Sequence, residues 1–327
     1  MSESTFWQGK RVAVTGATGM VGAWLVKDLL EQGASVIALV RDADPQSEFF
    51  RSGDYQKTTV VSGELENFNA VERMVNEHEA DTIFHLAAQP IVGAALRAPL
   101  PTFEANIRGT YHVLEAARLH SLLVKRVVIA SSDKAYGTSK KLPYLEDMPL
   151  RGEFPYEVSK SCADLITHSY FHTYGTPITV ARCGNIFGGG DLNWSRIVPD
   201  TIRRLLNGQP PELRSDGTFV RDYLYVKDVT RAYMVLAENM GKEGVDGEAF
   251  NFSPEVPMTV LEIVEAIQKV MGKTDLEPVI LNRAKNEILS QYLDSSKAKE
   301  RLGWTCQYSL EAGLKDTVDW YQEFLKR

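Results

Sequence analysis

The sequence has few cysteines, no long apolar run and no concentration of positive charge. Its three cysteines, Cys162, Cys183 and Cys306, lie far apart, so the sequence indicates neither a disulfide framework nor a zinc-ligand pattern. No apolar stretch approaches the roughly 20 residues that a membrane-spanning helix needs. The formal net charge is −7 without any Lys or Arg run, which argues against nucleic acid as the main partner.

What remains is the composition of an ordinary globular protein, with 44% apolar and 24% charged residues. The segment Met1–Lys10 lacks the basic start and apolar stretch of a secretion signal, so we expect a cytoplasmic protein with reduced thiols. A chain of 327 residues predicts one large domain or two closely packed ones.

Short β-branched runs alternate with helical patterns through the first half of the chain. Between the first two runs, Val21, Trp24, Leu25 and Leu29 have the spacing of one helix face. This alternation predicts an α/β protein with a doubly wound parallel sheet, the Rossmann fold. The predicted strands are Arg11–Thr15, Ser35–Val40, Thr58–Val61, Thr82–Leu86, Val127–Ala130 and Ile178–Ala181.

After about Gly188 the pattern changes, because Pro and Gly become frequent and helical stretches such as Val198–Asn207 and Val260–Met271 are separated by irregular segments. We therefore predict a first domain over residues 1–187 and a smaller region over residues 188–327. Two later segments, Tyr223–Val229 and Ala249–Phe252, could return to the main sheet as strands.

A glycine-rich loop, Thr15–Gly22, stands between the first predicted strand and the first predicted helix. In this context Gly16 permits a tight turn, Gly19 lets the backbone approach a pyrophosphate, and Gly22 allows close packing of helix on strand. The start of the helix, with Thr18 and Met20, offers free N–H groups to phosphate. The first domain is therefore predicted to bind NAD or NADP.

The end of the predicted second strand bears on which of the two is used. An acidic residue at this tip would bind the adenosine ribose and favour NAD, but Val40 stands there. The next residue, Arg41, could stack on adenine or meet the 2′-phosphate of NADP. The choice between NAD and NADP stays open.

Further cofactor contacts are predicted after the third strand, around the adenine, and after the fourth strand, where small residues let the backbone run beside the cofactor. His85 is more typical of a packed histidine than of a catalyst, and Asn106 is predicted to brace the sheet. The predicted contacts are Glu64, Leu65, Leu86, Ala87 and Ala88.

Tyr156 and Lys160 are four residues apart at the start of a predicted helix, which places them on one face. A phenol, with a pKa of about 10, is a poor base at neutral pH. A neighbouring ammonium and a positive nicotinamide ring would lower this pKa by stabilising the phenolate. Ser132 ends the preceding strand, where its hydroxyl could hold the substrate oxygen, and Lys160 could also bind the nicotinamide ribose.

The loop Thr15–Gly22 and the segments Asn106–Thr110, Ser131–Gly137 and Tyr156–Lys160 resemble the extended short-chain dehydrogenases, within the NAD-dependent epimerase/dehydratase family. More specific stretches are similar to CDP-glucose 4,6-dehydratases. They are Phe6–Val12, Phe84–Pro90, Ser132–Lys134, Gly184–Asp191 with Arg196–Asp200, and Tyr292–Ala298 with Leu302–Trp304.

The resemblance implies a redox-neutral dehydration of a nucleotide sugar, with a tightly bound, recycled cofactor and no metal. In it Asp133 would protonate the leaving C6 hydroxyl, and Lys134 would take the C5 proton where many relatives carry Glu. A 4-epimerase, a non-catalytic cofactor sensor, and a purely local ion pair between Asp133 and Lys134 are the alternatives.

The resemblance also implies contacts to the nucleotide diphosphate sugar and a homodimer formed by two helices, Ala105–Leu119 and Cys162–Tyr174. Arginine suits phosphate through its planar fork of donors. The implied substrate-binding residues are Gln89, Asn185, Arg196, Val198 and Arg221.

Overall fold

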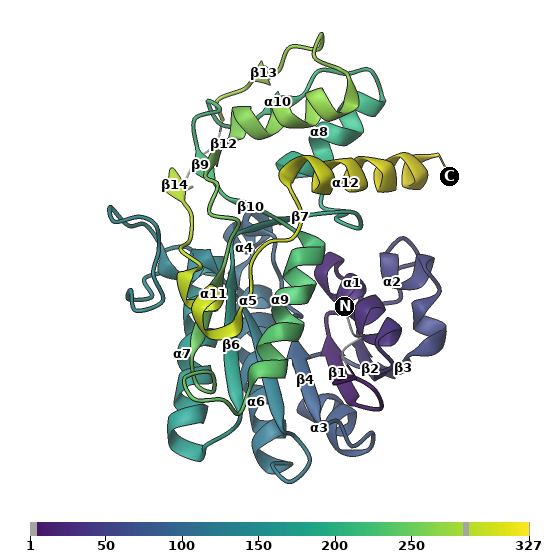
Figure 1. The fold of residues 1–327 in the computed structure, drawn as a ribbon, viewed down its shortest axis with the longest axis vertical. Helices are drawn as coiled ribbons and strands as arrows, with labels where there is room; N and C mark the ends of the chain where they lie inside the picture. The colour runs from purple at the N-terminus through teal and green to yellow at the C-terminus, as the bar shows by residue number, and fades with distance from the viewer. Residues whose placement is uncertain (1–4, 284–287, 327) are drawn as a thin grey trace.

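The computed structural model describes residues 5–283 and 288–326, so the first four residues of the expected signal-free N-terminus lie outside the described part. A seven-stranded parallel sheet forms its centre (Figure 1). The strand order is β11 (Ala249–Phe252), β6 (Ile178–Cys183), β5 (Arg126–Ser132), β4 (Thr82–His85), β1 (Arg11–Thr15), β2 (Ser35–Val40) and β3 (Thr59–Ser62).

Helices cover both faces of this sheet, because its strands alternate side chains between two apolar cores. Along β1, Val12 and Val14 pack in the core under α1 (Met20–Glu31) and α9 (Val226–Asn239), whereas Ala13 packs in the opposite core. The opposite core lies under α3 (Phe68–Asn76), α6 (Gly109–Leu119) and α7 (Pro155–Tyr174). The doubly wound fold predicted from the sequence is confirmed.

Short helices and turns connect these elements. They are α2 (Glu48–Arg51), η1 (Asp54–Lys57), α4 (Val92–Arg97), α5 (Pro99–Phe103), the π-helical turn η2 (Glu104–Arg108) and the 3-10 turn η3 (Asp133–Tyr136).

A second layer lies beyond the carboxyl ends of the strands, in the upper part of Figure 1. Its helices α8 (Ile197–Leu206), α10 (Val260–Met271) and α12 (Leu310–Leu325) share an apolar core with Phe187 and Tyr225. Its strands form small sheets, which are β7 (Asn185–Phe187) with β10 (Tyr223–Tyr225), β9 (Val220–Arg221) between β12 (Met258–Thr259) and β14 (Ser290–Gln291), and β8 (Glu212–Leu213) with β13 (Val279–Ile280).

Of the two segments proposed to return to the main sheet, one does so. Ala249–Phe252 pairs with β6 as β11, as expected. The segment Tyr223–Val229 does not join the main sheet, because Tyr223–Tyr225 forms strand β10 in a separate sheet with β7 and α9 begins at Val226. The chain after residue 188 thus contributes α9, β11 and α11 (Ser296–Leu302) to the sheet layer.

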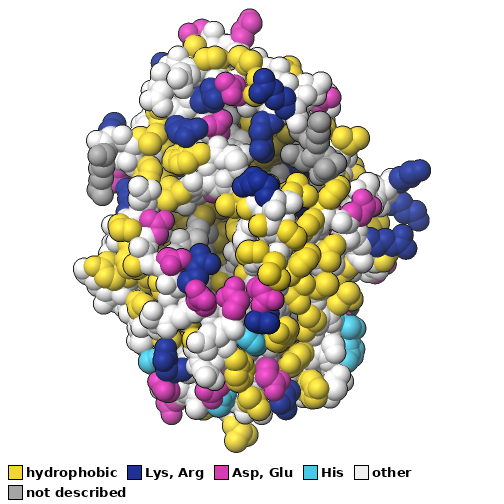
Figure 2. Space-filling model, turned by 180° about the vertical axis from the view of Figure 1, so that it is seen from behind, with side chains coloured by type: hydrophobic (Ala, Val, Ile, Leu, Met, Phe, Trp, Pro, Cys, Tyr) yellow, Lys and Arg dark blue, Asp and Glu magenta, His cyan; other side chains and the backbone are white. Residues whose placement is uncertain are grey.

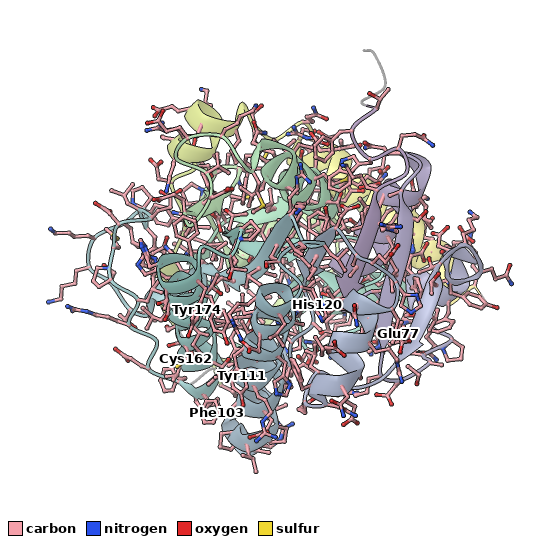
Figure 3. All side chains as sticks on the ribbon, turned by 90° about the horizontal axis from the view of Figure 1, so that it is seen from below. Glu77, Phe103, Tyr111, His120, Cys162 and Tyr174 are labelled. Carbon is pink, nitrogen blue, oxygen red and sulfur yellow. The ribbon has the colours of Figure 1, made fainter. Side chains whose placement is uncertain are left out.

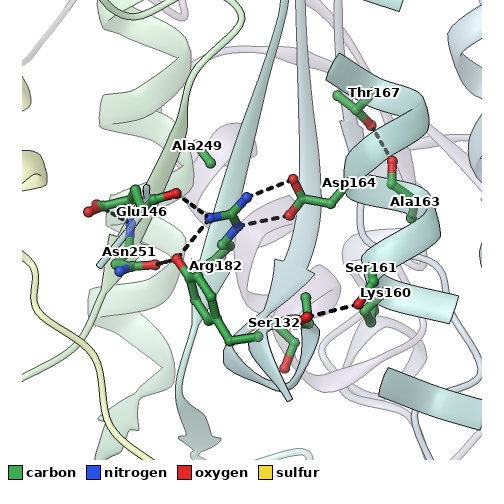
Figure 4. Close-up of polar contacts among 12 residues, drawn as sticks. Ser132, Glu146, Lys160, Ser161, Ala163, Asp164, Thr167, Arg182, Ala249 and Asn251 are labelled. Carbon is green, nitrogen blue, oxygen red and sulfur yellow. Dashed lines mark hydrogen bonds and ion pairs between the residues drawn. The ribbon is translucent and has the colours of Figure 1, made fainter. Parts of the chain in front are cut away.

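A buried polar network ties the sheet to the η3 turn (Figure 4). The Arg182 guanidinium on β6 donates two hydrogen bonds of 2.8 Å to the Asp164 carboxylate on α7, and both side chains are 6% exposed. It also donates to the Tyr136 hydroxyl at 2.8 Å, and that hydroxyl donates to Asn251 Oδ1 at 2.7 Å. Because Tyr136 ends η3, the network fixes the turn that begins at Asp133.

Replacing Arg182 with Met should lower the free energy of unfolding by about 3–5 kcal/mol, because the Asp164 carboxylate would stay buried without its partner. Denaturant titration measures this change. The control Lys315→Met removes an exposed pair with Asp319 and should leave the unfolding midpoint unchanged. Equal stability of the Arg182→Met variant and the native protein would contradict the assignment.

Candidate functional site

The glycine loop is packed so tightly that side chains are excluded at two positions. Gly16 has a φ of +79°, and a Cβ there would lie 2.7 Å from the Ala87 nitrogen. At Gly22 a Cβ would lie 2.0 Å from the Gly16 carbonyl oxygen. At Gly19 the nearest atom would be that oxygen at 3.3 Å, so this position stays open on its outer side.

The open side of this loop fits the pyrophosphate of a dinucleotide. Gly19 is the N-cap of α1, and no side chain caps this end, so the first N–H groups of the helix are available to phosphate. Thr18 and Met20 flank the cap. Ala87 donates its N–H to Thr15 Oγ1 at 3.2 Å, which holds the segment of Leu86, Ala87 and Ala88 beside the loop.

The predicted adenosine side of the site lies at the tips of β2 and β3. These tips are joined by a hydrogen bond from the Gly63 nitrogen to the Val40 carbonyl, at 3.1 Å. Arg41 and Glu64 are exposed there, and Leu65 is buried. The Arg41 guanidinium pairs with Asp42 at 2.6 Å, so any 2′-phosphate would compete with this carboxylate.

His85 and Asn106 have structural partners, as the sequence suggested. The His85 ring is 3% exposed and lies within hydrogen-bonding distance of the Thr15 and Thr110 hydroxyls. Burial lowers the pKa of His85 to about 3, so the ring is neutral. Asn106 receives the Gln89 N–H at 2.7 Å and donates to Ser159 Oγ at 2.9 Å, which braces the segment after β4 against α7 rather than the sheet itself.

Ser132, Tyr156 and Lys160 meet at the carboxyl end of β5. The Ser132 hydroxyl donates to Asp133 Oδ1 at 2.8 Å, and it partly offsets the effect of burial, which raises the pKa of the nearby Tyr156 phenol. The Lys160 ammonium, one helical turn after Tyr156 on α7, donates to the Ala130 carbonyl at 2.7 Å. Strand β5 and helix α7 thus bring together three residues that span 28 positions of the sequence, from Ser132 to Lys160.

Burial is the main cause of the pKa shifts of Tyr156 and Lys160, the two residues on α7. It raises the pKa of Tyr156 to about 12, and the Arg196 charge and the Ser132 hydrogen bond only partly oppose this shift. Burial also lowers the pKa of Lys160 to about 8. The expected lowering of the Tyr156 pKa is therefore not a property of the protein alone, and the phenol is protonated until a positive nicotinamide ring lies beside it.

Asp133 and Lys134 follow Ser132 in η3. Asp133 is 2% exposed, and its Oδ2 atom has no hydrogen-bond partner among the described residues. The Lys134 ammonium donates to Gln291 Oε1 at 3.3 Å, which connects η3 to β14. Gln291 is fully buried.

The predicted substrate residues lie around the junction between the two layers. Arg196 pairs with Asp191 at 3.0 Å, and its charge acts on Tyr156. Val198 is 4% exposed and packs in the core of the upper layer. Asn185 begins β7. The Gln89 Oε1 atom receives the Ile91 N–H at 2.5 Å, and the Gln89 Nε2 atom donates to Thr102 Oγ1 on α5 at 3.3 Å.

Arg221 is buried and has partners that the sequence did not predict. Its guanidinium donates to the carbonyls of Val220 at 2.8 Å, Leu289 at 3.2 Å and Ile288 at 2.5 Å. These bonds hold the start of the 288–291 segment beside β9. A diphosphate at Arg221 would have to share the guanidinium N–H groups with these carbonyls or displace the carbonyls.

Asp222, which the sequence analysis missed, is the fully buried neighbour of Arg221. The only signal for Asp222 in the sequence is that it follows Arg221, a candidate phosphate ligand. That position does not reveal that Asp222 is buried.

Figure 2 shows the molecule hollowed between its upper and lower parts, with Lys and Arg side chains on the upper rim. Within residues 5–283 and 288–326, no cluster of three or more His, Cys, Asp or Glu side chains is arranged to hold a metal.

Comparisons with known proteins identify the family and the fold. A family model described as GDP-mannose 4,6 dehydratase matches residues 13–317. The CDP-glucose 4,6-dehydratase of Salmonella typhimurium is 32% identical over 344 residues, covering 100% of this chain and 94% of the relative.

Two solved structures share the fold over almost the whole chain. The UDP-glucose 4-epimerase of Thermotoga maritima, crystallised with UDP-glucose, has a TM-score of 0.87 and 30% identity, covering 96% of this chain and 99% of its own. The dTDP-glucose 4,6-dehydratase of Bacillus anthracis, in complex with NAD, has a TM-score of 0.85 and 27% identity, covering 96% and 97%. Dehydratases and epimerases are thus both relatives.

Replacing Gly19 with Val should weaken cofactor binding without unfolding the protein, because a Cβ there meets only the Gly16 carbonyl oxygen, at 3.3 Å, whereas the side chain would occupy the space predicted for the pyrophosphate. We expect calorimetry to give an affinity at least about tenfold weaker, or about 1.4 kcal/mol, at an unchanged melting temperature. The matched variant Gly22→Ala should lose both affinity and stability. Unchanged cofactor affinity in Gly19→Val would place the pyrophosphate elsewhere.

Proposed function

The chain belongs to the GDP-mannose 4,6 dehydratase family of NAD-dependent nucleotide-sugar dehydratases and epimerases, and from this premise we propose that it is a 4,6-dehydratase for a CDP-glucose-like substrate. The observation that carries the proposal is the buried Asp133 carboxyl, which is hydrogen-bonded to Ser132 and has an oxygen without a partner in the described structure. A 4-epimerase has no use for an acid at this place, because no hydroxyl leaves its substrate.

Oxidation at C4 uses the three residues at the end of β5 and the start of α7. Ser132 holds the C4 hydroxyl, and Tyr156 in its phenolate form takes the proton of that hydroxyl. Lys160, whose pKa of about 8 leaves much of it charged at neutral pH, stabilises this phenolate and binds the nicotinamide ribose. The bound nicotinamide cofactor supplies the hydride acceptor for C4 and the hydride donor for C6.

Elimination follows because the C4 ketone acidifies the C5 proton. Lys134, in its amine form, removes this proton, and the electron pair forms the C5–C6 double bond as the C6–O bond breaks. The Asp133 carboxyl gives its proton to the departing oxygen, which leaves as water. After hydride addition at C6, the Lys134 ammonium returns a proton to C5.

Ser132 can relay a proton that balances these transfers. Asp133 ends the elimination as a carboxylate, while Tyr156 still carries the proton taken from the C4 hydroxyl. The Ser132 hydroxyl donates to Asp133 Oδ1 at 2.8 Å, and it influences the pKa of the nearby Tyr156 phenol. The proton therefore passes from Tyr156 through Ser132 to Asp133, and the net reaction releases one water and consumes no cofactor.

The substrate's diphosphate is assigned to the junction between the two layers. Arg196 is partly exposed at this junction and carries a charge that reaches Tyr156. Arg221 on β9 and Asn185 on β7 are the further residues proposed to hold the diphosphate. Gln89 and Val198 stay proposed substrate contacts. The preference for cytidine rests on the CDP-glucose 4,6-dehydratase relative.

The alternative reaction is 4-epimerisation, which needs only Ser132, Tyr156 and Lys160. It is favoured by the bond between Lys134 and Gln291, which could make η3 a structural link to β14. In that case Asp133 and Lys134 would shape the turn, and hydride would return to C4.

We further propose a cytoplasmic homodimer formed through α6 and α7. Tyr111, Cys162 and Tyr174 lie on these neighbouring helices in Figure 3. Figure 2 shows apolar side chains gathered on this face, and Leu119 and Leu165 are 51% and 57% exposed there. Sedimentation velocity would report the dimer.

No helix in the described part of the chain is long and apolar enough to span a bilayer.

Incubation with a panel of nucleotide hexoses, followed by mass analysis, should reveal loss of one water from a CDP-hexose. Asp133→Asn should slow water loss at least about 10²-fold, because the acid is missing, while oxidation continues and the absorbance of reduced cofactor accumulates. The control Asp147→Asn changes an exposed acid after the same turn and should behave as the native protein. An inverted C4 hydroxyl without water loss would instead identify an epimerase.

A further inference from the structure

Two buried carboxyl groups, rather than one, lie at the carboxyl end of β5. Asp133 is 2% exposed and Asp222 is fully buried. Each keeps one oxygen, Oδ2 of Asp133 and Oδ1 of Asp222, without a hydrogen-bond partner among the residues described. Buried carboxylate oxygens normally have donors, so this coincidence calls for a chemical explanation.

The backbone holds Asp222 against Gly184. Asp222 stands between β9 and β10, and the Asn185 N–H donates to its carbonyl at 3.3 Å. A Cβ on Gly184 would lie 2.1 Å from Asp222 Oδ1, so only glycine leaves room for this carboxyl. The other oxygen, Oδ2, accepts from the Ser253 hydroxyl and from the Leu293 N–H at 3.2 Å.

The pairing of β5 with β6 brings Asp133 to the same place. Ser132 is the register partner of Cys183, so the next residues along the two strands are Asp133 and Gly184. Asp133 is thereby held beside the glycine that the Asp222 carboxyl covers. Two carboxylates so close in a buried site cannot both ionise at low cost.

The charge balance around the pair favours retention of a proton. Burial, and next the Asp133 charge, raise the pKa of Asp222 to about 7. After burial, the charges of the two carboxylates also raise the pKa values of the uncharged titratable groups around them, which are Tyr156 from α7, Cys183 from β6, Tyr144 from the segment after η3, Tyr223 from β10 and Cys306 from the segment before α12.

The Arg221 guanidinium, although adjacent to Asp222 in the chain, is directed to other acceptors. It donates to backbone carbonyls of β9 and of the 288–289 segment. A proton shared between Asp133 and Asp222 would neutralise one of the two carboxyls.

We propose that Asp222 is a positioning residue that shares one proton with Asp133 at neutral pH, and thereby keeps Asp133 in the acid form that elimination requires. The shared proton is the one that leaves with the C6 hydroxyl as water. The proton taken from the C4 hydroxyl by Tyr156 then restores the pair through Ser132. This inference rests on the proposed dehydratase function.

The test is the pH dependence of water loss in Asp222→Asn, which keeps the size of the side chain but removes the neighbouring charge. Without that charge Asp133 loses its proton at lower pH, so the alkaline limb of the rate profile should move down by about one pH unit, or tenfold in proton concentration. At pH 8 the variant should be at least about tenfold slower and should accumulate reduced cofactor, and acidification should restore its rate.

Ser253→Ala is the matched control, because it removes a hydrogen bond to the same carboxyl and leaves its charge. Its alkaline limb should stay in place or move upward. If Asp222→Asn folds and has the native pH profile, Asp222 is merely structural and the inference is wrong.

A second measurement does not depend on activity. At pH 7 the infrared spectrum of the native protein should contain the carbonyl band of a buried carboxylic acid, and Asp133→Asn and Asp222→Asn should each remove it. Absence of this band in the native protein overturns the shared proton even if dehydration is observed. Absence of water loss from every nucleotide hexose, with the band present, overturns the proposed function instead.

Discussion

The parallel pairing of β5 with β6 is the constraint on which the site depends. This register sets Ser132 opposite Cys183, and so directs Ser132 and Asp133 to the edge where α7 presents Tyr156. A slip of one residue would turn these side chains to the other face of the sheet. The hydrogen bonds of Arg182 support the same register, because they join β6 to Asp164 on α7 and to Tyr136 at the end of η3.

Burial at this edge gives the site its chemistry. It holds Tyr156 protonated, weakens the hold of Lys160 on its proton, and raises the pKa of Asp222. Lys160 and Asp222 are therefore close to a change of charge at neutral pH, whereas Tyr156 needs a positive ring beside it to lose its proton. A solvent-exposed site with the same residues would not have this sensitivity, since water screens their mutual interactions.

The sequence predicted those features that depend on neighbouring residues in the chain. The glycine loop and the strands Arg11–Thr15 and Ser35–Val40 were correctly identified, because turn chemistry and periodicity are local. The segment Tyr223–Val229 was only partly predicted, because its apolar residues suit either a buried strand, as in Tyr223–Tyr225, or the start of a helix, as from Val226.

Contacts between residues far apart in the sequence could not be predicted within the site. Arg221 reads as a phosphate ligand in the sequence, yet its three carbonyl acceptors include two that lie 67 and 68 positions away. Likewise, the burial of Asp222 against Gly184 follows from the pairing of β7 with β10, which no local pattern announces.

The central claim, that the chain catalyses an internal redox dehydration, is tested most directly by following one hydrogen. A nucleotide hexose carrying deuterium at C4 should yield a 4-keto-6-deoxy sugar with that deuterium at C6 of the same molecule, while solvent hydrogen enters C5. Deuterium retained at C4, with no exchange at C5, would contradict the account and identify the reaction as epimerisation.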